Sequence, residues 1–167
     1  MKKMLILGMA VLILSLVFVG CGGDDDDSTG GNDIATSSSL TVTGIPTSHN
    51  GKWLFAYGSN FTGTASYMAA DSANTSGGGN LSGVKITGTS ATLKIWRRSN
   101  QTLVGFDGTL NYSNFAFIVA TKATLTQEEI LAIRAYGSTD NGSWEGNDGS
   151  VDFSSGTGSA TWGPLPF

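Results

Sequence analysis

Hydrophobic residues follow three different patterns along the chain, and each pattern predicts a different kind of segment. From Met4 to Val19 they form one unbroken run, and between residues 22 and 39 they are almost absent. From Leu40 onward they alternate with polar residues in short stretches bounded by Gly, Asn and Asp, which is typical of half-buried β-strands. The order predicts a leader at residues 1–20, a linker at 21–39 and a single β-rich domain at 40–167.

Several stretches of the domain have the composition and alternation of strands. The predicted strands are Leu40–Thr43, Lys52–Tyr57, Gly63–Ala69, Val84–Thr87, Ala91–Arg97, Phe115–Ala120, and short ones around Val151–Phe153 and Ser159–Trp162. We expect Val84–Thr87 and Ala91–Arg97 to pair with each other around Gly88. The run Phe115–Ala120 is apolar on both faces, which predicts a central strand covered on each side. Phe117 is therefore an expected core residue.

A helix is predicted at about 126–136. Thr126 and Glu129 have the spacing of a capping box, Leu125 and Ile130 that of a hydrophobic staple, and Gly137 suits the end. Glycine-rich polar stretches at residues 71–80 and 140–149 predict two loops, with turns at Asn141-Gly142 and Asp148-Gly149. The expected fold is mostly β, either a β-sandwich or a small β-barrel, with this one short helix.

The leader has the order of a secretion signal. Lys2 and Lys3 precede an apolar run of roughly 16 residues, shorter than the ~20 that a spanning helix needs. The run Phe18-Val19-Gly20-Cys21 resembles the lipobox of bacterial lipoproteins. This resemblance implies cleavage after Gly20 and attachment of lipid to Cys21.

Lipidation would hold the mature protein on a membrane, because two or three acyl chains bind firmly where one binds marginally. The expected location is the bacterial outer membrane, on its periplasmic or its surface face. Asp24–Asp27 follow the cysteine closely, and such acidic runs resemble signals that send some lipoproteins to the cell surface. Residues 22–39 otherwise predict a flexible tether.

Charge argues against a nucleic-acid partner. The formal net charge of the chain is −4. Without Lys2 and Lys3 it is −6, and without the five aspartates of the linker as well it is about −1. Arg97 and Arg98 are the densest basic spot, and nucleic-acid binding requires larger clusters.

Five short motifs occur along the domain in the order Leu40-Thr-Val-Thr-Gly-Ile-Pro46, Asn50-Gly-Lys-Trp53, Lys94-Ile-Trp96, Phe153-Ser-Ser-Gly156 and Gly158-Ser-Ala-Thr-Trp162. In this order they resemble a family of small uncharacterised β-domain lipoproteins from bacteria. The resemblance implies an exported, mostly β domain and carries over no catalytic residue. The predicted helix departs from it.

Catalytic chemistry has few candidate residues in this chain. Cys21 would be consumed by lipidation, His49 is the single histidine, and no Gly-x-Ser-x-Gly motif is present. We therefore expect no enzymatic activity and no cofactor.

The acidic stretch 140–152 is a weak candidate for a calcium site. Asp140, Glu145, Asp148 and Asp152 supply carboxylates at short spacing, but Gly142 breaks the EF-hand pattern at its third position. Two solvated turns explain the stretch better, so no metal is expected.

Two aromatic residues are candidate ligand-binding positions. Trp96 alternates with Lys94 and Thr92 on an expected polar face, and Trp144 lies in a glycine-rich loop. Aromatic rings in water stack on sugars or fill partner pockets. They predict a surface binding or adhesion module for a glycan or protein. The alternatives are a structural envelope lipoprotein and an apolar-ligand carrier with a lipocalin-like barrel.

Overall fold

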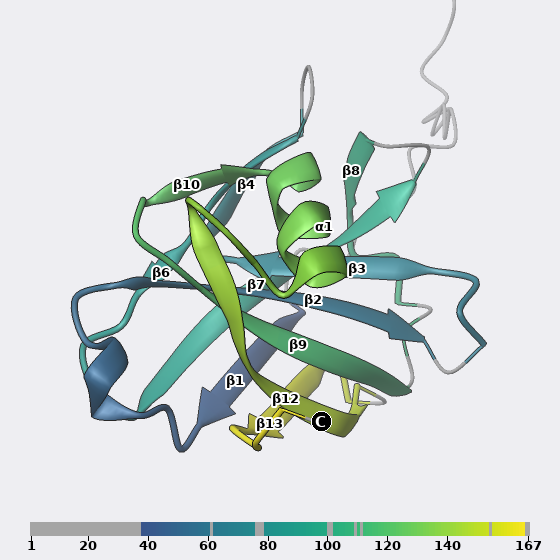
Figure 1. Ribbon diagram of the computed structural model, residues 1–167. Helices are drawn as coiled ribbons and strands as arrows, with labels where there is room; N and C mark the ends of the chain where they lie inside the picture. The colour runs from purple at the N-terminus through teal and green to yellow at the C-terminus, as the bar shows by residue number, and fades with distance from the viewer. Residues whose placement is uncertain are drawn as a thin grey trace, which may run out of the picture. The chain divides into compact units, whose positions relative to one another are not determined.

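The computed structural model describes residues 38–60, 62–75, 79–99, 102–108, 110, 112–153 and 155–165 (Figure 1). The described part is mostly β with one short helix, as the sequence predicts. Its elements are β1 Ser39–Thr43, η1 Thr47–His49, β2 Trp53–Asn60, β3 Ser66–Ala70, β4 Ser72–Asn74, β5 Asn80–Ser82, β6 Val84–Lys85, β7 Ser90–Ser99, β8 Thr102–Gly105, β9 Tyr112–Ala120, β10 Thr124–Thr126, α1 Gln127–Tyr136, β11 Ser138–Thr139, β12 Gly142–Asp152 and β13 Thr157–Thr161.

Ten strands form one sheet that curls into a half-barrel. The order along the sheet is β11-β12-β9-β2-β3-β7-β1-β13, with β6 added beside β2 and β8 beside β7. β1 and β13 run parallel, and the other paired strands of the described part run antiparallel. The curl brings β12 back to the chain that follows β13, where Asn147 and Gly163 exchange two backbone hydrogen bonds of 3.2 and 2.9 Å.

The concave side of the sheet is filled by an inner cluster of buried side chains. Phe117 is fully buried there, as the sequence predicts. Other members are Leu40, Val42, Leu54, Ala56, Tyr67, Leu93, Ile95, Phe106, Phe115, Val119, Val151, Phe153 and Ala160. Trp162 packs against this cluster, and its ring lies on Phe117 with centroids 5.2 Å apart. Because apolar side chains meet on this side, it supplies most of the hydrophobic stabilisation of the sheet.

On the convex side an outer cluster lies beneath α1. Phe55, Met68 and Ile118 of the sheet meet Ile130 and Ile133 of the helix, and all are fully buried. A small sheet of β10, β5 and β4 adds Leu125 and Leu81. In Figure 1, α1 stands above β2 and β3, whereas β1 and β13 lie at the bottom of the view. No residue of β1 or β13 belongs to the outer cluster among the described residues.

The helix begins and ends as its sequence predicts. Thr126 accepts a hydrogen bond from the Glu129 amide at 3.1 Å, and the Glu129 carboxylate accepts from the Thr126 amide at 2.8 Å. Gly137 ends the helix with a positive φ of 82°. Lys122 donates to the same carboxylate at 2.6 Å and Asn141 at 2.8 Å, so this one side chain connects both flanks of the helix.

Three local predictions are wrong. β6 pairs with β2 rather than with β7, which instead pairs with β1, β3 and β8. Within the predicted loop at 71–80, β4 and β5 are strands, while residues 76–78 are outside the described residues. The predicted loop at 140–149 is mostly strand, because β12 runs from Gly142 and pairs with β9, with bulges at Glu145 and at Gly149–Ser150.

Candidate functional site

The outer face of β13, β1 and β7 carries an array of polar side chains, and none of those on β1 and β13 lies beneath α1 in the described part of the chain. The outward residues of these strands, which together we call the open face, are exposed or half-buried. They are Thr157, Ser159, Thr161, Ser39, Thr41, Thr43, Ser90, Thr92, Lys94, Trp96 and Arg98.

Strand alternation explains why these residues point outward. On β1, Leu40 and Val42 enter the inner cluster, so Ser39, Thr41 and Thr43 must face the other side. The same alternation holds on β7, where Leu93 and Ile95 point inward. The open face is therefore fixed by the packing of the core behind it.

Pairing aligns the hydroxyl groups of the open face in rows. Thr41 lies opposite Ser159 on one side and Thr92 on the other, and Thr43 opposite Thr161 and Ser90. Neighbouring rows are roughly 7 Å apart along the strands, and neighbouring strands about 4.8 Å apart. Thr41 and Thr92 share a hydrogen bond of 3.1 Å between their hydroxyls. The surface thus offers closely spaced hydroxyl donors and acceptors.

Trp96 marks the boundary between the open face and the outer cluster. It is half-buried and packs against that cluster, with Met68 of β3 directly opposite. Gly105 of β8, opposite Trp96 on the other side, adds no side chain over it. Within the described ranges the indole of Trp96 makes no hydrogen bond and no ring contact. The part of its ring that the outer cluster leaves exposed is therefore available to a ligand.

The cations of the domain divide into engaged and unengaged groups. Arg97 pairs with Asp107, and Lys122 pairs with Glu129. Lys85 and Arg134 lie over the rings of Trp53 and Trp144, at 5.9 and 4.0 Å from the ring centroids. Lys52, Lys94 and Arg98 have neither an ion pair nor a ring contact in the described part of the chain. Two of these three flank Trp96 on the outer face of β7.

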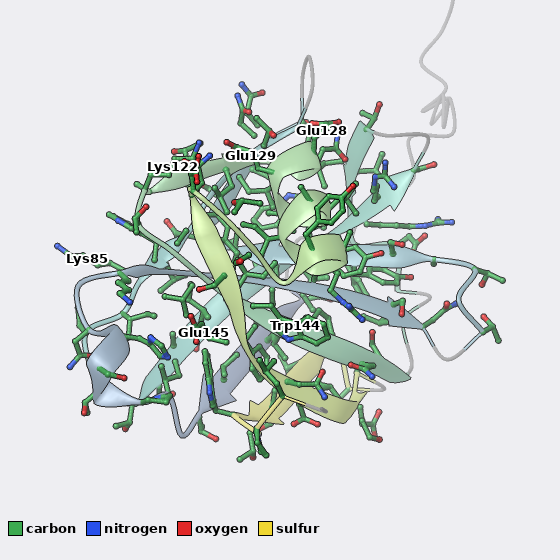
Figure 2. All side chains as sticks on the ribbon, in the orientation of Figure 1. Lys85, Lys122, Glu128, Glu129, Trp144 and Glu145 are labelled. Atoms are coloured by element: carbon green, nitrogen blue, oxygen red, sulfur yellow. The ribbon has the colours of Figure 1, made fainter. Side chains whose placement is uncertain are left out.

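Trp144 is placed differently from Trp96, although both were candidates. It lies on β12, half-buried against the outer cluster, with the Arg134 guanidinium over its ring. Its indole N–H donates to the Gly146 carbonyl at 2.7 Å. Figure 2 shows Trp144 and Glu145 on either side of β12. The ring and its polar atom already have partners inside the domain.

The four candidate calcium ligands have separate surroundings, with Asp152 exposed at the end of β12 opposite Tyr112. Asp140 is exposed in the two-residue loop between β11 and β12, and Glu145 accepts a hydrogen bond from the Ser143 hydroxyl. Asp148 accepts from the amides of Ser150 and Thr161 at 3.1 and 2.8 Å. No group of three or more His, Cys, Asp or Glu suited to a metal occurs among the described residues. Asp148 instead connects β12 to β13.

His49 ends η1 and lies against Trp162, with ring centroids 5.5 Å apart. Its Nδ1 is buried and has no hydrogen-bond partner in the described part. Burial lowers the pKa of His49, Glu145 raises it and Lys52 lowers it, with a net decrease from the usual value. The ring is half-buried and lies on Trp162, which packs against the inner cluster.

Cys21 and the rest of the predicted leader and linker up to residue 37 lie outside the described residues, so the predicted lipidation stays a prediction. The helix search, confined to the described residues, finds none with the length and apolarity to cross a membrane.

Comparisons with known proteins give no relative for this chain. No family model matches it, and neither a curated protein nor a solved structure is significantly similar. The resemblance to small β-domain lipoproteins stays a prediction, and arguments about function rest on the residues themselves.

The open face itself was not predicted, although part of its signal is present in the sequence. Ser39-x-Thr41-x-Thr43 and Thr157-x-Ser159-x-Thr161 share one alternation of hydroxyl residues. That these segments lie side by side in parallel follows from the curl of the whole sheet, and no local pattern indicates it.

Proposed function

We propose that the chain is a lipid-anchored binding module whose open face holds carbohydrate at a bacterial surface. The observation that carries the proposal is Trp96, a half-buried ring that no other described side chain stacks on, beside an uncovered array of hydroxyl groups. Sugars present apolar C–H faces and many hydroxyls. An aromatic ring beside polar donors and acceptors complements both kinds of surface.

The position of the face supports this proposal. A strand framework holds the ring and hydroxyls in place, so little conformational entropy is lost when a ligand binds. Tyr57 lies on the other side of the fully buried Met68 from Trp96, and its hydroxyl lies 3.1 Å from that of Ser66. The row therefore offers two rings on the same side of the sheet.

Two alternatives are weaker. An apolar-ligand carrier needs space inside the curl of the sheet, and there the side chains of the inner cluster meet one another. A purely structural envelope role would account for the packing of Trp96 on the outer cluster but gives no reason for the rows of hydroxyl groups beside it. The proposal also includes export and anchoring through Cys21, which the sequence alone supports.

Binding to a glycan array tests the proposal directly. The full-length protein in detergent is applied to immobilised glycans, and we expect binding that Trp96→Ala reduces by tenfold or more. Trp53→Ala is the matched control, because Trp53 is also a half-buried outward tryptophan at the outer cluster but lies on β2 with Lys85 over its ring.

Melting temperatures of the three proteins show whether each variant is folded. Binding that survives Trp96→Ala in a folded protein would contradict the proposed site. An array on which the wild type binds no glycan would contradict the function.

A further inference from the structure

The strongest unexplained feature of the open face is the charge on β7. Lys94, Trp96 and Arg98 are successive outward residues, so the tryptophan has a cation on each side at a spacing of roughly 7 Å. β7 shows no irregularity in its registers with β1 and β3 over this stretch, so the three side chains share one side of the sheet.

Among the described residues neither cation has a carboxylate partner, although the domain has enough acids to supply one. Arg97, immediately beside them in sequence, points to the opposite side and pairs with Asp107. Lys94 lies between Ser39 and Ala70, and Arg98 between Ser66 and Leu103, so none of the four neighbours across the strands is acidic. The Arg98 Nε is buried and has no hydrogen-bond partner in the described part.

We propose that the open face is selective for acidic polysaccharides, with Lys94 and Arg98 binding carboxylates of uronic acid units on either side of a sugar stacked on Trp96. This inference rests on the proposed function and adds the chemical class of the glycan. Arginine and lysine form charge-assisted hydrogen bonds with carboxylates, and these are stronger than bonds between neutral groups. Rows of hydroxyls from Ser39 and Thr41 extend the contact to neutral positions of the polymer.

A polymer ligand fits this geometry better than a small acid. The cations lie on the surface of one strand about four residues apart, and a single carboxylate reaches one of them at a time. A chain of sugars engages both together, which raises affinity through effective concentration. Because the charges of Lys94 and Arg98 are screened by salt, we also expect the affinity for the polymer to fall as the salt concentration rises.

Polygalacturonate and its methyl ester distinguish the charge from the sugar. The two polymers share one backbone, and esterification removes the carboxylate charge. We expect the full-length protein in detergent to bind polygalacturonate at least tenfold more tightly than the ester in low salt, with the difference shrinking in 0.5 M NaCl.

The double variant Lys94→Gln/Arg98→Gln should lose this preference and bind both polymers alike. The matched control Lys52→Gln/Lys85→Gln removes the same amount of charge from residues outside the open face and should keep it. Arg98→Lys in the wild-type background preserves the charge and should retain most of the preference.

Each contrary outcome is informative. Equal binding of both polymers by the wild type would overturn the selectivity while leaving a glycan module standing. Failure to bind these polymers and every glycan on the array would remove both proposals. Tighter binding to phosphatidylglycerol vesicles than to polygalacturonate, lost in the double variant, would reassign the cations to a lipid surface and overturn the inference.

Discussion

The indole of Trp162 stacks on the ring of Phe117, with centroids 5.2 Å apart and planes 24° apart. This contact joins the chain after the last strand to the central strand of the sheet. His49 lies on Trp162 as well, at 5.5 Å. One tryptophan therefore links the core, the end of η1 and the C-terminal segment, and two of the predictions below probe it.

Gly146→Ala should destabilise the domain, because a Cβ at residue 146 would lie 2.5 Å from the Trp162 ring. The ring is held by Phe117 and by its own backbone hydrogen bond to Thr43, so it has little room to shift. We expect a loss of about 2 to 3 kcal/mol in the free energy of unfolding, measured by urea denaturation. Gly149→Ala, on the same strand with nothing within 4 Å of its Cβ position, is the control. Equal effects of the two variants would contradict the packing argument.

Phe117→Ala should cost about 3 to 5 kcal/mol, because it removes a fully buried ring from the inner cluster. Trp144→Ala should cost less, about 2 kcal/mol, because its ring is half-buried and loses the contact with Arg134. The sequence alone favours Trp144 as a loop anchor whose loss lowers the melting temperature little. Thermal and urea unfolding of both variants decide between these expectations, and an unaltered Trp144→Ala protein would restore the loop anchor.

Stability should fall as the pH is lowered from about 7 to 5. Burial against Trp162 lowers the pKa of His49 in the folded state, so the unfolded state binds a proton first. Folding favours the neutral imidazole of His49. Its contribution to stability is fully present above the pKa of the unfolded state and is lost as the pH falls through the pKa of the folded state. His49→Gln should flatten this part of the profile. A wild-type melting temperature constant across the range would refute it.

Chelators and reductants should leave the melting temperature of the folded domain unchanged. The candidate carboxylates are separated, with Asp148 bound to the amides of Ser150 and Thr161. Calorimetry with and without EDTA tests this expectation. A drop of several degrees on chelation would point to calcium at Asp140, Glu145, Asp148 and Asp152.

Cys21→Ser should prevent lipid attachment, because serine offers no thiol for the thioether bond. We expect the variant to accumulate as an uncleaved precursor or to be released as soluble protein. Detergent phase partitioning measures this, with the wild type entering the detergent phase. A mature variant, cleaved after Gly20, that still enters the detergent phase would show that another feature holds the protein on the membrane.

Local signals in the sequence were sufficient for part of the fold. The ends of α1 depend on Thr126, Glu129 and Gly137 within one short segment, and the structure confirms all three. Phe115–Ala120 reads as a central strand because both faces are apolar, and β9 does pair with β2 and β12.

Contacts between distant segments explain what the sequence could not indicate. Asp148-Gly149 has turn composition, yet pairing with β9 holds it within a strand and a bulge takes up the extra residues. Val84 follows β5 closely and precedes β7, but β2 offers its edge and pairs with it instead. The open face depends on the same long-range pairing.

The parallel pairing of β1 with β13 has a consequence for how the domain folds. Leu40 lies beside Gly158, and Thr43 beside Thr161, so the first strand acquires one of its two neighbours from the far end of the chain. Closing so long a loop is entropically expensive and slow compared with forming a hairpin. A chain still emerging from a ribosome or a translocation pore therefore has an incomplete sheet with one edge of β1 bare. The hydroxyl rows of Ser39, Thr41 and Thr43 cannot gain their second flank before residues 157–161 have emerged, so the complete open face requires nearly the whole chain.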